Sequence, residues 1–362
     1  MEVVAYIVFV FTAIQFVVAL ANLLFLQRLP AASGCDALVS ILVPARNEEN
    51  NIPQLIENVL SQSHQNFELI IFNDQSTDNT AKIIDSYCSK DSRIQLINSE
   101  ELPSGWTGKN FACHTLANNA KGKYLLFLDA DVQISGDIIG RTLSAMQKHK
   151  LALLSIFPMQ KMVSTGERLV VPNMNYILLS LLPLILVRKS KFSSLSAANG
   201  QFMLFDAGKY KQYQLHKKVS KQRVEDIQIA RMLKYGQEKI ACLSSTNQVQ
   251  CRMYNGYREA INGLSRSVIM FFGNSFVAAL LFWLITTLGI VSIILNMHAI
   301  GVVIYVCFLV SIRLMTSIVS KQNLLLNLLM GYPQKLVLGL VIIKAIRAKI
   351  KKEFEWKGRK VT

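Results

Sequence analysis

Two aspartates stand directly after a short, fully apolar run near the middle of the chain. Asp129 and Asp131 follow Leu125–Leu128 with a single alanine between them. A buried strand does not normally end in two carboxylates, because each buried charge needs a positive partner. Mg²⁺ and Mn²⁺ prefer oxygen ligands and usually share them with the phosphates of a substrate. The pair therefore indicates a divalent cation, Mg²⁺ or Mn²⁺, bound together with a diphosphate.

Other polar clusters accompany this pair. Residues 44–49 (PARNEE) and residues 73–79 (NDQSTDN) each follow a short apolar run, and Glu225 with Asp226 precedes an apolar face at helical spacing. Lys109 stands behind two glycines, where it is either a ligand of phosphate or a solvated side chain.

The helices and strands that must position these residues alternate as in an α/β domain. Strands are predicted at 39–43, 67–72, 94–97 and 123–128, and helices at 52–61, from Thr80 onward and at 110–120. Strands that alternate with helices of this length predict a parallel sheet. Ligands of such sheets bind beyond the carboxyl ends of the strands, which is where the polar clusters fall.

Taken together, the clusters resemble the family 2 glycosyltransferases, which have the nucleotide-sugar-binding GT-A fold. The matching markers are PARNE at 44–48, DQSTD at 74–78, DAD at 129–131 and ED at 225–226, and the likeness covers roughly residues 38–266. A narrower likeness joins the chain to membrane-anchored members associated with carotenoid and hopanoid lipids. It rests on residues 103–109, 199–202, 252–254 and 356–359. Where those members read GGH before the ED pair, this chain keeps only His216.

The resemblance implies a role for each matching residue. Asp74 would contact the nucleotide base in a pocket lined by Pro44, Arg46 and Glu48. Asp129 would face the ribose or the donor sugar and, with Asp131, the metal that bridges the diphosphate.

The same resemblance places the reaction at the second acidic pair. Asp226, beside Glu225, would be the general base on the acceptor hydroxyl, as an inverting displacement requires. Lys109 and Arg252 are candidate phosphate ligands, since a guanidinium fork suits phosphate geometry.

Apolar runs at both ends predict membrane attachment, and mean hydropathy is +0.32. Four segments are expected: an N-terminal transmembrane anchor over 1–28, a cytoplasmic GT-A domain over 36–266, two transmembrane helices over 267–320, and an interfacial or re-entrant segment with a basic tail over 321–362. Arg28 follows the first apolar run and Glu2 precedes it, so the positive-inside rule places the domain in the cytoplasm.

Two apolar stretches are expected not to cross the membrane. Residues 169–189 are interrupted by prolines and predict an amphipathic helix lying on the membrane surface. Residues 324–346 contain Gly331, Pro333 and Lys335, which divide the stretch into pieces too short to span.

The net charge of +16 predicts an anionic partner, and the basic runs adjoin apolar segments, which favours a membrane over nucleic acid. The expected partners are a nucleotide-sugar donor, preferably UDP-linked, and a lipid acceptor with a hydroxyl or carboxyl group. The alternatives are a processive polysaccharide synthase, whose Q-x-x-R-W signature is absent from residues 248–253, and a non-catalytic membrane scaffold. The six scattered cysteines are interpreted as buried thiols.

Overall fold

The computed structural model describes residues 2–222, 224–351, 355–356 and 359–360. The chain forms two compact units. We call residues 27–159 with 184–251 the α/β unit, and residues 1–26 with 160–183 and the chain from Arg252 onward the helical unit. This division differs from the expected domain over 36–266, because residues 160–183 and 252–266 group with the helical unit.

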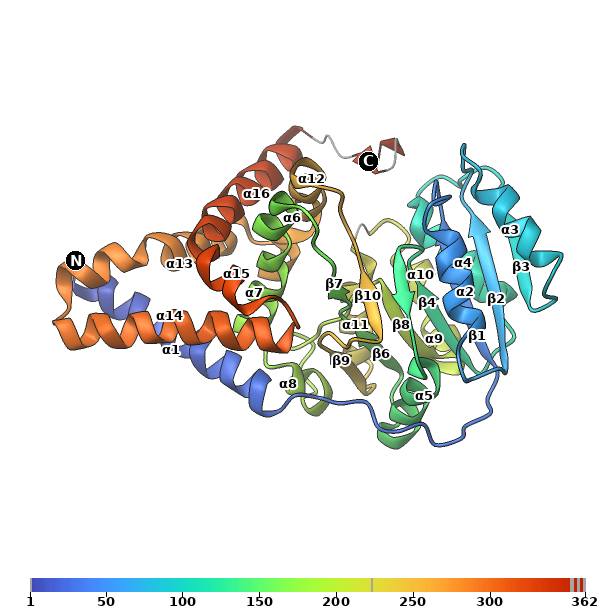
Figure 1. Ribbon diagram of the computed structural model, residues 1–362, viewed down its shortest axis with the longest axis horizontal. Coiled ribbons are helices and arrows are strands. Elements are labelled where there is room, and N and C mark those ends of the chain that lie inside the picture. Colours follow the sequence, from blue (N-terminus) through green and yellow to red (C-terminus); the bar gives the residue numbers. More distant parts are fainter. Residues whose placement is uncertain (1, 223, 352–354, 357–358, 361–362) are drawn as a thin grey trace. The chain divides into compact units, whose positions relative to one another are not determined.

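The α/β unit is built on a seven-stranded sheet in the order β3-β2-β1-β4-β8-β6-β9 (Figure 1). Its strands are β1 (Val39–Ala45), β2 (Phe67–Asn73), β3 (Ile94–Asn98), β4 (Tyr124–Leu128), β6 (Leu153–Ile156), β8 (Phe202–Asp206) and β9 (Ile240–Leu243). Every residue of β2 and β4 is buried, as expected of strands covered on both faces. The four predicted strands lie within a residue or two of the observed ones.

The parallel arrangement is confirmed for β3, β2, β1 and β4, but β8 departs from it. β8 runs antiparallel to both β4 and β6, with Leu128 opposite Phe202. The chain therefore enters β8 at the edge where β4 ends, and the peptide N–H of Asp129 donates to the carbonyl of Gln201 at 3.2 Å. This register places residues 199–201 beside the aspartate pair.

The helices of the α/β unit follow the strands at short intervals. They are α2 (Ile52–Leu60), α3 (Thr80–Cys88), α4 (Gly108–Asn119), α5 (Ile138–His149), α8 (Leu184–Lys189), α9 (Ala207–Tyr213), α10 (Leu215–Lys218) and α11 (Glu225–Tyr235). Two short strands, β5 (Val132–Ile134) and β10 (Val249–Cys251), pair antiparallel beside the main sheet. Strand β7 (Met159–Gln160) lies at the boundary of the two units.

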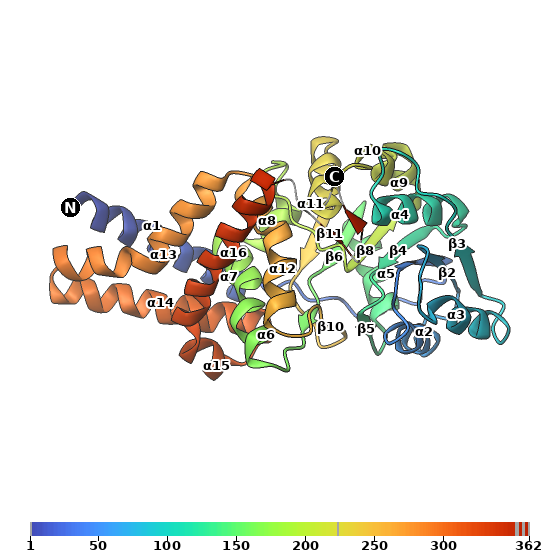
Figure 2. The ribbon, with the colours of Figure 1, turned by 90° about the horizontal axis from the view of Figure 1, so that it is seen from above.

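The helical unit contains three helices long and apolar enough to cross a membrane: α1 (Glu2–Leu24), α13 (Phe276–Asn296) and α14 (Ala299–Val319). They lie side by side (Figure 2), and Phe308 of α14 contacts Phe9 and Phe16 of α1. The remaining elements are α6 (Thr165–Val170), α7 (Pro172–Leu181), α12 (Tyr257–Ser267), the 3₁₀ helix η1 (Val268–Phe272), α15 (Leu324–Leu329), α16 (Gly331–Lys351), β11 (Glu355–Trp356) and β12 (Arg359–Lys360).

The segment 169–189, expected as one amphipathic helix, is divided among α6, α7 and α8, and α8 belongs to the α/β unit. All nine residues of α7 from Pro172 to Ser180 are buried, so the helix has no polar face for water. It packs against α1, α14 and α16, and the side chain of Asn22 donates to the carbonyl of Leu179 at 2.9 Å.

Two predicted boundaries in the C-terminal part also shift. The first of the two transmembrane helices expected over 267–320 begins only at Phe276, because Gly273 and Asn274 take left-handed conformations (φ +64° and +66°) that end η1. The break expected near Pro333 lies earlier, at Met330, and α16 continues through the proline. Pro333 stands in the first turn of α16, where a backbone N–H has no partner within the helix.

One buried amide ties α4 to the chain that leads into α11. Asn110 is fully buried, and its Nδ2 donates to the carbonyls of Val219 at 2.7 Å and Gln222 at 2.8 Å. The peptide N–H of Thr107 donates to the carbonyl of Ser220 at 2.9 Å. Residues 107–110 therefore hold the segment from which Glu225 and Asp226 emerge.

We predict that Asn110→Leu lowers the Tm of the full-length protein and reduces its free energy of unfolding by about 1–3 kcal/mol. The substitution removes the side-chain donor of buried carbonyls. Asn118→Leu is the matched control, since Asn118 is exposed on the same helix and should change stability by less than about 0.5 kcal/mol. Thermal unfolding in detergent measures both. Equal Tm values for the two variants would contradict the assigned role.

Candidate active site

The loops after β1 and β2 are joined by hydrogen bonds at the carboxyl edge of the sheet. Arg46 donates from Nη1 to the carbonyl of Asp74 at 2.6 Å, and the peptide N–H of Asp74 donates to the carbonyl of Ala45 at 2.8 Å. The peptide N–H of Glu48 donates to Oγ1 of Thr80 at 2.8 Å. The structure thus brings Arg46, Glu48 and the buried Asp74 together, and Pro44 is the last but one residue of β1.

These loops contain residues that motif reasoning did not select. Asn47 and Gln75 both have φ of +53°, a left-handed conformation that asparagine adopts more readily than most residues. Asn47 Oδ1 accepts a hydrogen bond from the peptide N–H of Thr77 at 2.9 Å, and Glu49 Oε2 accepts one from that of Asn79 at 3.0 Å. The sequence signal for these residues is a side-chain oxygen in a turn between a strand and a helix, where it can accept a hydrogen bond from a peptide N–H.

Lys109 lies between the two acidic pairs. Its Nζ is 2.8 Å from Oδ1 of Asp129 and 3.2 Å from Oε1 of Glu225. Burial alone would lower the pKa of Lys109, but the carboxylates of Asp129 and Glu225 outweigh it and hold the pKa well above its usual range. Of the two interpretations left open by the sequence, a solvated lysine is wrong, because the side chain is half-buried and ion-paired.

Asp226 is held by backbone donors in the same cluster. Its Oδ2 accepts from the peptide N–H of Gly200 at 2.9 Å, and its Oδ1 accepts from that of Ile227 at 2.7 Å. Burial, followed by the charge of Glu225, raises the pKa of Asp226 to about 7. A carboxylate with this pKa can accept a proton near neutral pH.

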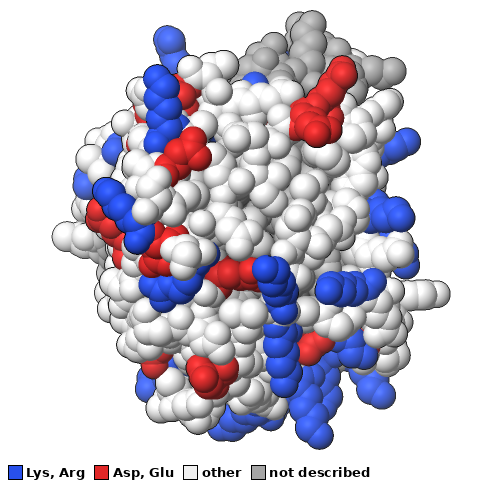
Figure 3. All heavy atoms as spheres, turned by 90° about the vertical axis from the view of Figure 1, so that its right-hand side faces the viewer, with Lys and Arg blue, Asp and Glu red and all other residues white. Residues whose placement is uncertain are grey.

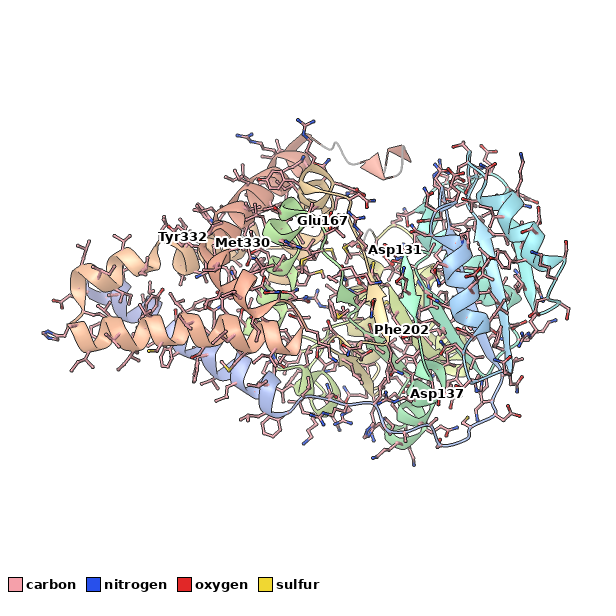
Figure 4. The ribbon with its side chains drawn as sticks, viewed as in Figure 1. Asp131, Asp137, Glu167, Phe202, Met330 and Tyr332 are labelled. Carbon is pink, nitrogen blue, oxygen red and sulfur yellow. The ribbon has the colours of Figure 1, made fainter. Side chains whose placement is uncertain are left out.

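Asp131 has a buried oxygen that is free to bind a ligand. Oδ1 of Asp131 has no hydrogen-bond partner among the described residues, while the thiol of Cys251 bonds to the same carboxyl group. Cys251 in turn accepts from Nε2 of Gln201 at 2.8 Å. Burial and the neighbouring Asp129 raise the pKa of Asp131 to about 7 (Figure 4 labels Asp131).

The donor set fits a divalent cation that is shared with a substrate. Within the described part of the chain, His, Cys, Asp and Glu nowhere gather in a group of three or more that could hold a metal. Asp131 and Asp129 can supply two carboxylates, and a cation here would take its remaining ligands from phosphate oxygens and water. The unpartnered Oδ1 of Asp131 is the observation that supports this fit.

Other sequence-derived candidates lie in different surroundings. Arg252 belongs to the helical unit, where its Nη2 is 3.0 Å from Oε1 of Glu167, so its proposed contact with phosphate stays a prediction. His216 is buried and bonded to the hydroxyl of Tyr210 at 2.7 Å. Burial lowers the pKa of His216 to about 3, which leaves the ring neutral and fits a packing role. Trp106 stacks on His114, with ring centroids 5.1 Å apart.

The prediction that all six cysteines are buried thiols is only partly confirmed. All six are free, and Cys113, Cys242 and Cys251 are buried. Cys307, on the candidate membrane helix α14, is exposed. A thiol on a membrane-crossing helix can face lipid without loss of free energy, since free cysteine behaves as a small apolar side chain.

Comparisons with known proteins agree with this geometry. The family model described as Glycosyl transferase family 2 matches residues 40–213. The 4,4'-diaponeurosporenoate glycosyltransferase of Staphylococcus haemolyticus is 26% identical over 237 residues, which cover 63% of this chain and 60% of that protein. Glycosyltransferase GlyG of Streptococcus pneumoniae is 30% identical over 102 residues, which cover 28% of this chain and 33% of that protein.

A solved structure extends the likeness to the fold. The mannosyltransferase PcManGT from Pyrobaculum calidifontis, in complex with GDP-Man and Mn²⁺, matches with a TM-score of 0.59 at 14% identity, over 96% of this chain and 99% of that one. The matched family domain spans β1 to α9 and contains both the DQSTD and the DAD markers. Residues 40–213 therefore form a glycosyltransferase family 2 domain, and the α/β unit has the GT-A type of mixed sheet.

Proposed function

We propose that the protein is an inverting glycosyltransferase that moves a sugar from a nucleotide-diphosphate donor to a lipid acceptor at the cytoplasmic face of a membrane. One observation carries this proposal: Lys109 pairs with both Asp129 and Glu225, so the donor-side carboxylates and the candidate base lie in one cluster. A scaffold without catalysis would have no need to confine four carboxylates there, because their mutual repulsion costs free energy.

In this proposal the nucleotide occupies the joined loops after β1 and β2, with Asp74 toward the base and Pro44, Arg46 and Glu48 around it. Asp129 and Asp131 hold Mg²⁺ or Mn²⁺, which supplies charge stabilisation to the leaving diphosphate. Lys109 adds a positive charge beside Asp129, within reach of the same phosphates.

The reaction step belongs to Asp226. Asp226 accepts the proton of the acceptor hydroxyl while the hydroxyl oxygen bonds to the anomeric carbon and the bond from that carbon to the diphosphate oxygen breaks. The nucleoside diphosphate leaves with the electron pair, and the anomeric configuration inverts. Backbone donors from Gly200 and Ile227 fix the carboxylate for this transfer, and Glu225 keeps Lys109 nearby. With a carboxylate acceptor no base is required, and Asp226 would orient the acceptor.

The lipid acceptor and the cytoplasmic orientation are supported by the helical unit. Three candidate membrane spans and the basic end of α16 (Lys344, Arg347 and Lys349) favour an anchored enzyme with its basic end at an anionic leaflet. The compound in the name of the staphylococcal relative, 4,4'-diaponeurosporenoate, is the first acceptor to test. UDP-sugars are the first donors, followed by the GDP-Man of the Pyrobaculum enzyme.

The other functions receive less support. A processive synthase needs more membrane spans than the three found among the described residues. A nucleic-acid surface would be continuously basic. On the face shown in Figure 3, Asp and Glu side chains lie among the Lys and Arg side chains.

We predict that Asp226→Asn lowers kcat by about 10²–10⁴-fold and leaves donor affinity nearly unchanged, because the amide keeps the shape but cannot accept the proton. Turnover with lipid extracts and calorimetric binding of the donor measure the two quantities. The proposed role fails if Asp226→Asn turns over a hydroxyl acceptor at the wild-type rate.

We predict that Asp131→Asn weakens metal-dependent donor binding at least ~10-fold, because it removes a charged ligand from the cation site. Asp137→Asn is the matched control, since Asp137 stands at the start of α5 and outside the cluster. Donor titrations with Mn²⁺, with Mg²⁺ and after chelation give the comparison. Donor binding that survives chelation in the wild type would contradict the metal assignment.

The raised pKa of Asp226 predicts a pH dependence. The base works only when ionised, so kcat/KM should rise with pH through about 7 and level off above it. Asp131 has a similar pKa, but a saturating cation favours its ionised form, so assays at saturating metal isolate Asp226. The low-pH limb should disappear from the residual activity of Asp226→Asn. If the activity of Asp226→Asn still fell at low pH, the titrating group would be a residue other than Asp226.

A further inference from the structure

The helical unit encloses two basic side chains that have no carboxylate partner among the described residues. Arg313 of α14 is 6% exposed and Lys335 of α16 is 7% exposed. The ion pair found in the described part of this unit joins Arg252 to Glu167 instead. Ionisable side chains inside membrane helices are costly, and they commonly mark the path or site of a charged ligand.

The two cations meet around one aromatic ring. The guanidinium carbon of Arg313 lies 4.4 Å from the ring centroid of Tyr176 on α7, and Nζ of Lys335 lies 5.9 Å from the same centroid. Arg313 donates to the carbonyl of Gly331 at 3.0 Å, and Lys335 donates to that of Thr286 at 2.7 Å. Both cations therefore lie beside the Tyr176 ring, among residues of α7, α13, α14 and α16, and the hydrogen-bond partners found for them among the described residues are neutral.

Buried hydrogen-bond donors on α14 and α7 remain unused. Nε of Arg313 and Nδ2 of Asn175 are buried without a partner among the described residues. A buried donor without a partner costs about 1–3 kcal/mol. Neighbouring amides are fixed in place, because Asn173 donates to the carbonyl of Gln334 at 3.0 Å and Gln334 donates to Oδ1 of Asn327 at 3.1 Å. Unused donors beside two uncompensated cations are what an oxyanion would satisfy.

We propose that Arg313 and Lys335, with Tyr176, form an interior site for the phosphate or carboxylate group of a membrane lipid. The guanidinium fork suits a two-oxygen contact, and the ammonium adds a second charge. Arg313 stands six residues before the end of α14, or ~9 Å along the helix axis, in the third of the helix nearest that end. The proposal rests on the membrane placement in the proposed function and not on the transfer reaction.

The test uses the full-length protein in nanodiscs of neutral phosphatidylcholine with increasing phosphatidylglycerol. Native mass spectrometry counts the retained anionic lipid, and high salt screens binding to surface lysines. We expect the wild type to retain anionic lipid at high salt, and Lys335→Met to weaken that binding roughly tenfold, or ~1.4 kcal/mol. Arg347→Gln is the matched control, because Arg347 is exposed on the same helix and should change only the salt-sensitive part.

A second variant guards against loss of folding. Arg313→Lys keeps the charge but removes the fork, so it should retain the fold and weaken lipid binding. Wild-type lipid binding in both Lys335→Met and Arg313→Lys would overturn the site. Inorganic phosphate that displaces the lipid at equal charge concentration would overturn the assignment to a lipid. Lipid retention and its displacement by phosphate are both measured without a sugar donor, so failure of this proposal is distinguishable from failure of the transferase proposal.

Discussion

The acidic cluster of the α/β unit is held together by the ion pairs of a single lysine. Asp129 and Asp131 end one strand, Glu225 and Asp226 begin one helix, and the four carboxylates would repel one another without a cation. Lys109 pairs with one member of each acidic pair, at 2.8 and 3.2 Å. The two carboxyls that it does not contact closely, those of Asp131 and Asp226, are the ones whose pKa rises to about 7. The cluster thus divides into a neutralised half and a half that is ready to bind a cation or a proton.

One antiparallel strand of the sheet brings further backbone groups to this cluster. Because β8 is antiparallel to β4, the residues just before it return to the edge where the aspartates lie. Gly200 is the residue at that point, and a Cβ there would lie 3.2 Å from both Glu225 Oε1 and Lys109 Nζ. Its missing side chain leaves room for the ion pairs, while its peptide N–H holds Asp226. A position of this kind restricts the residue type by space and not by backbone conformation.

Local patterns predicted well what local chemistry determines. The strands from Val39 to Leu128 and the helices between them follow from apolar runs and turn residues, and the acidic pairs follow from their places at strand and helix ends. The contacts of Cys251 with Asp131 and of Arg252 with Glu167 join residues far apart in the sequence, so no spacing rule could find them. The prediction of a surface helix over 169–189 was wrong for a related reason. An apolar segment fits a membrane surface as well as a protein interior, and only the helices packed around α7 show that it is interior.

The discontinuous make-up of the helical unit also sets the order in which it can be completed during synthesis. Helix α7, buried from Pro172 to Ser180, leaves the ribosome well before α13 and α14, and α1 is made before all of them. At ordinary elongation rates the chain from Leu181 to Val319 takes on the order of ten seconds. During that interval α7 has α1 as a neighbour but lacks α14 and α16, against which it also packs in the finished unit. The α/β unit is complete at Cys251, so it can fold while α7 still lacks these neighbours, and the membrane or the insertion machinery can cover α7 in the interval.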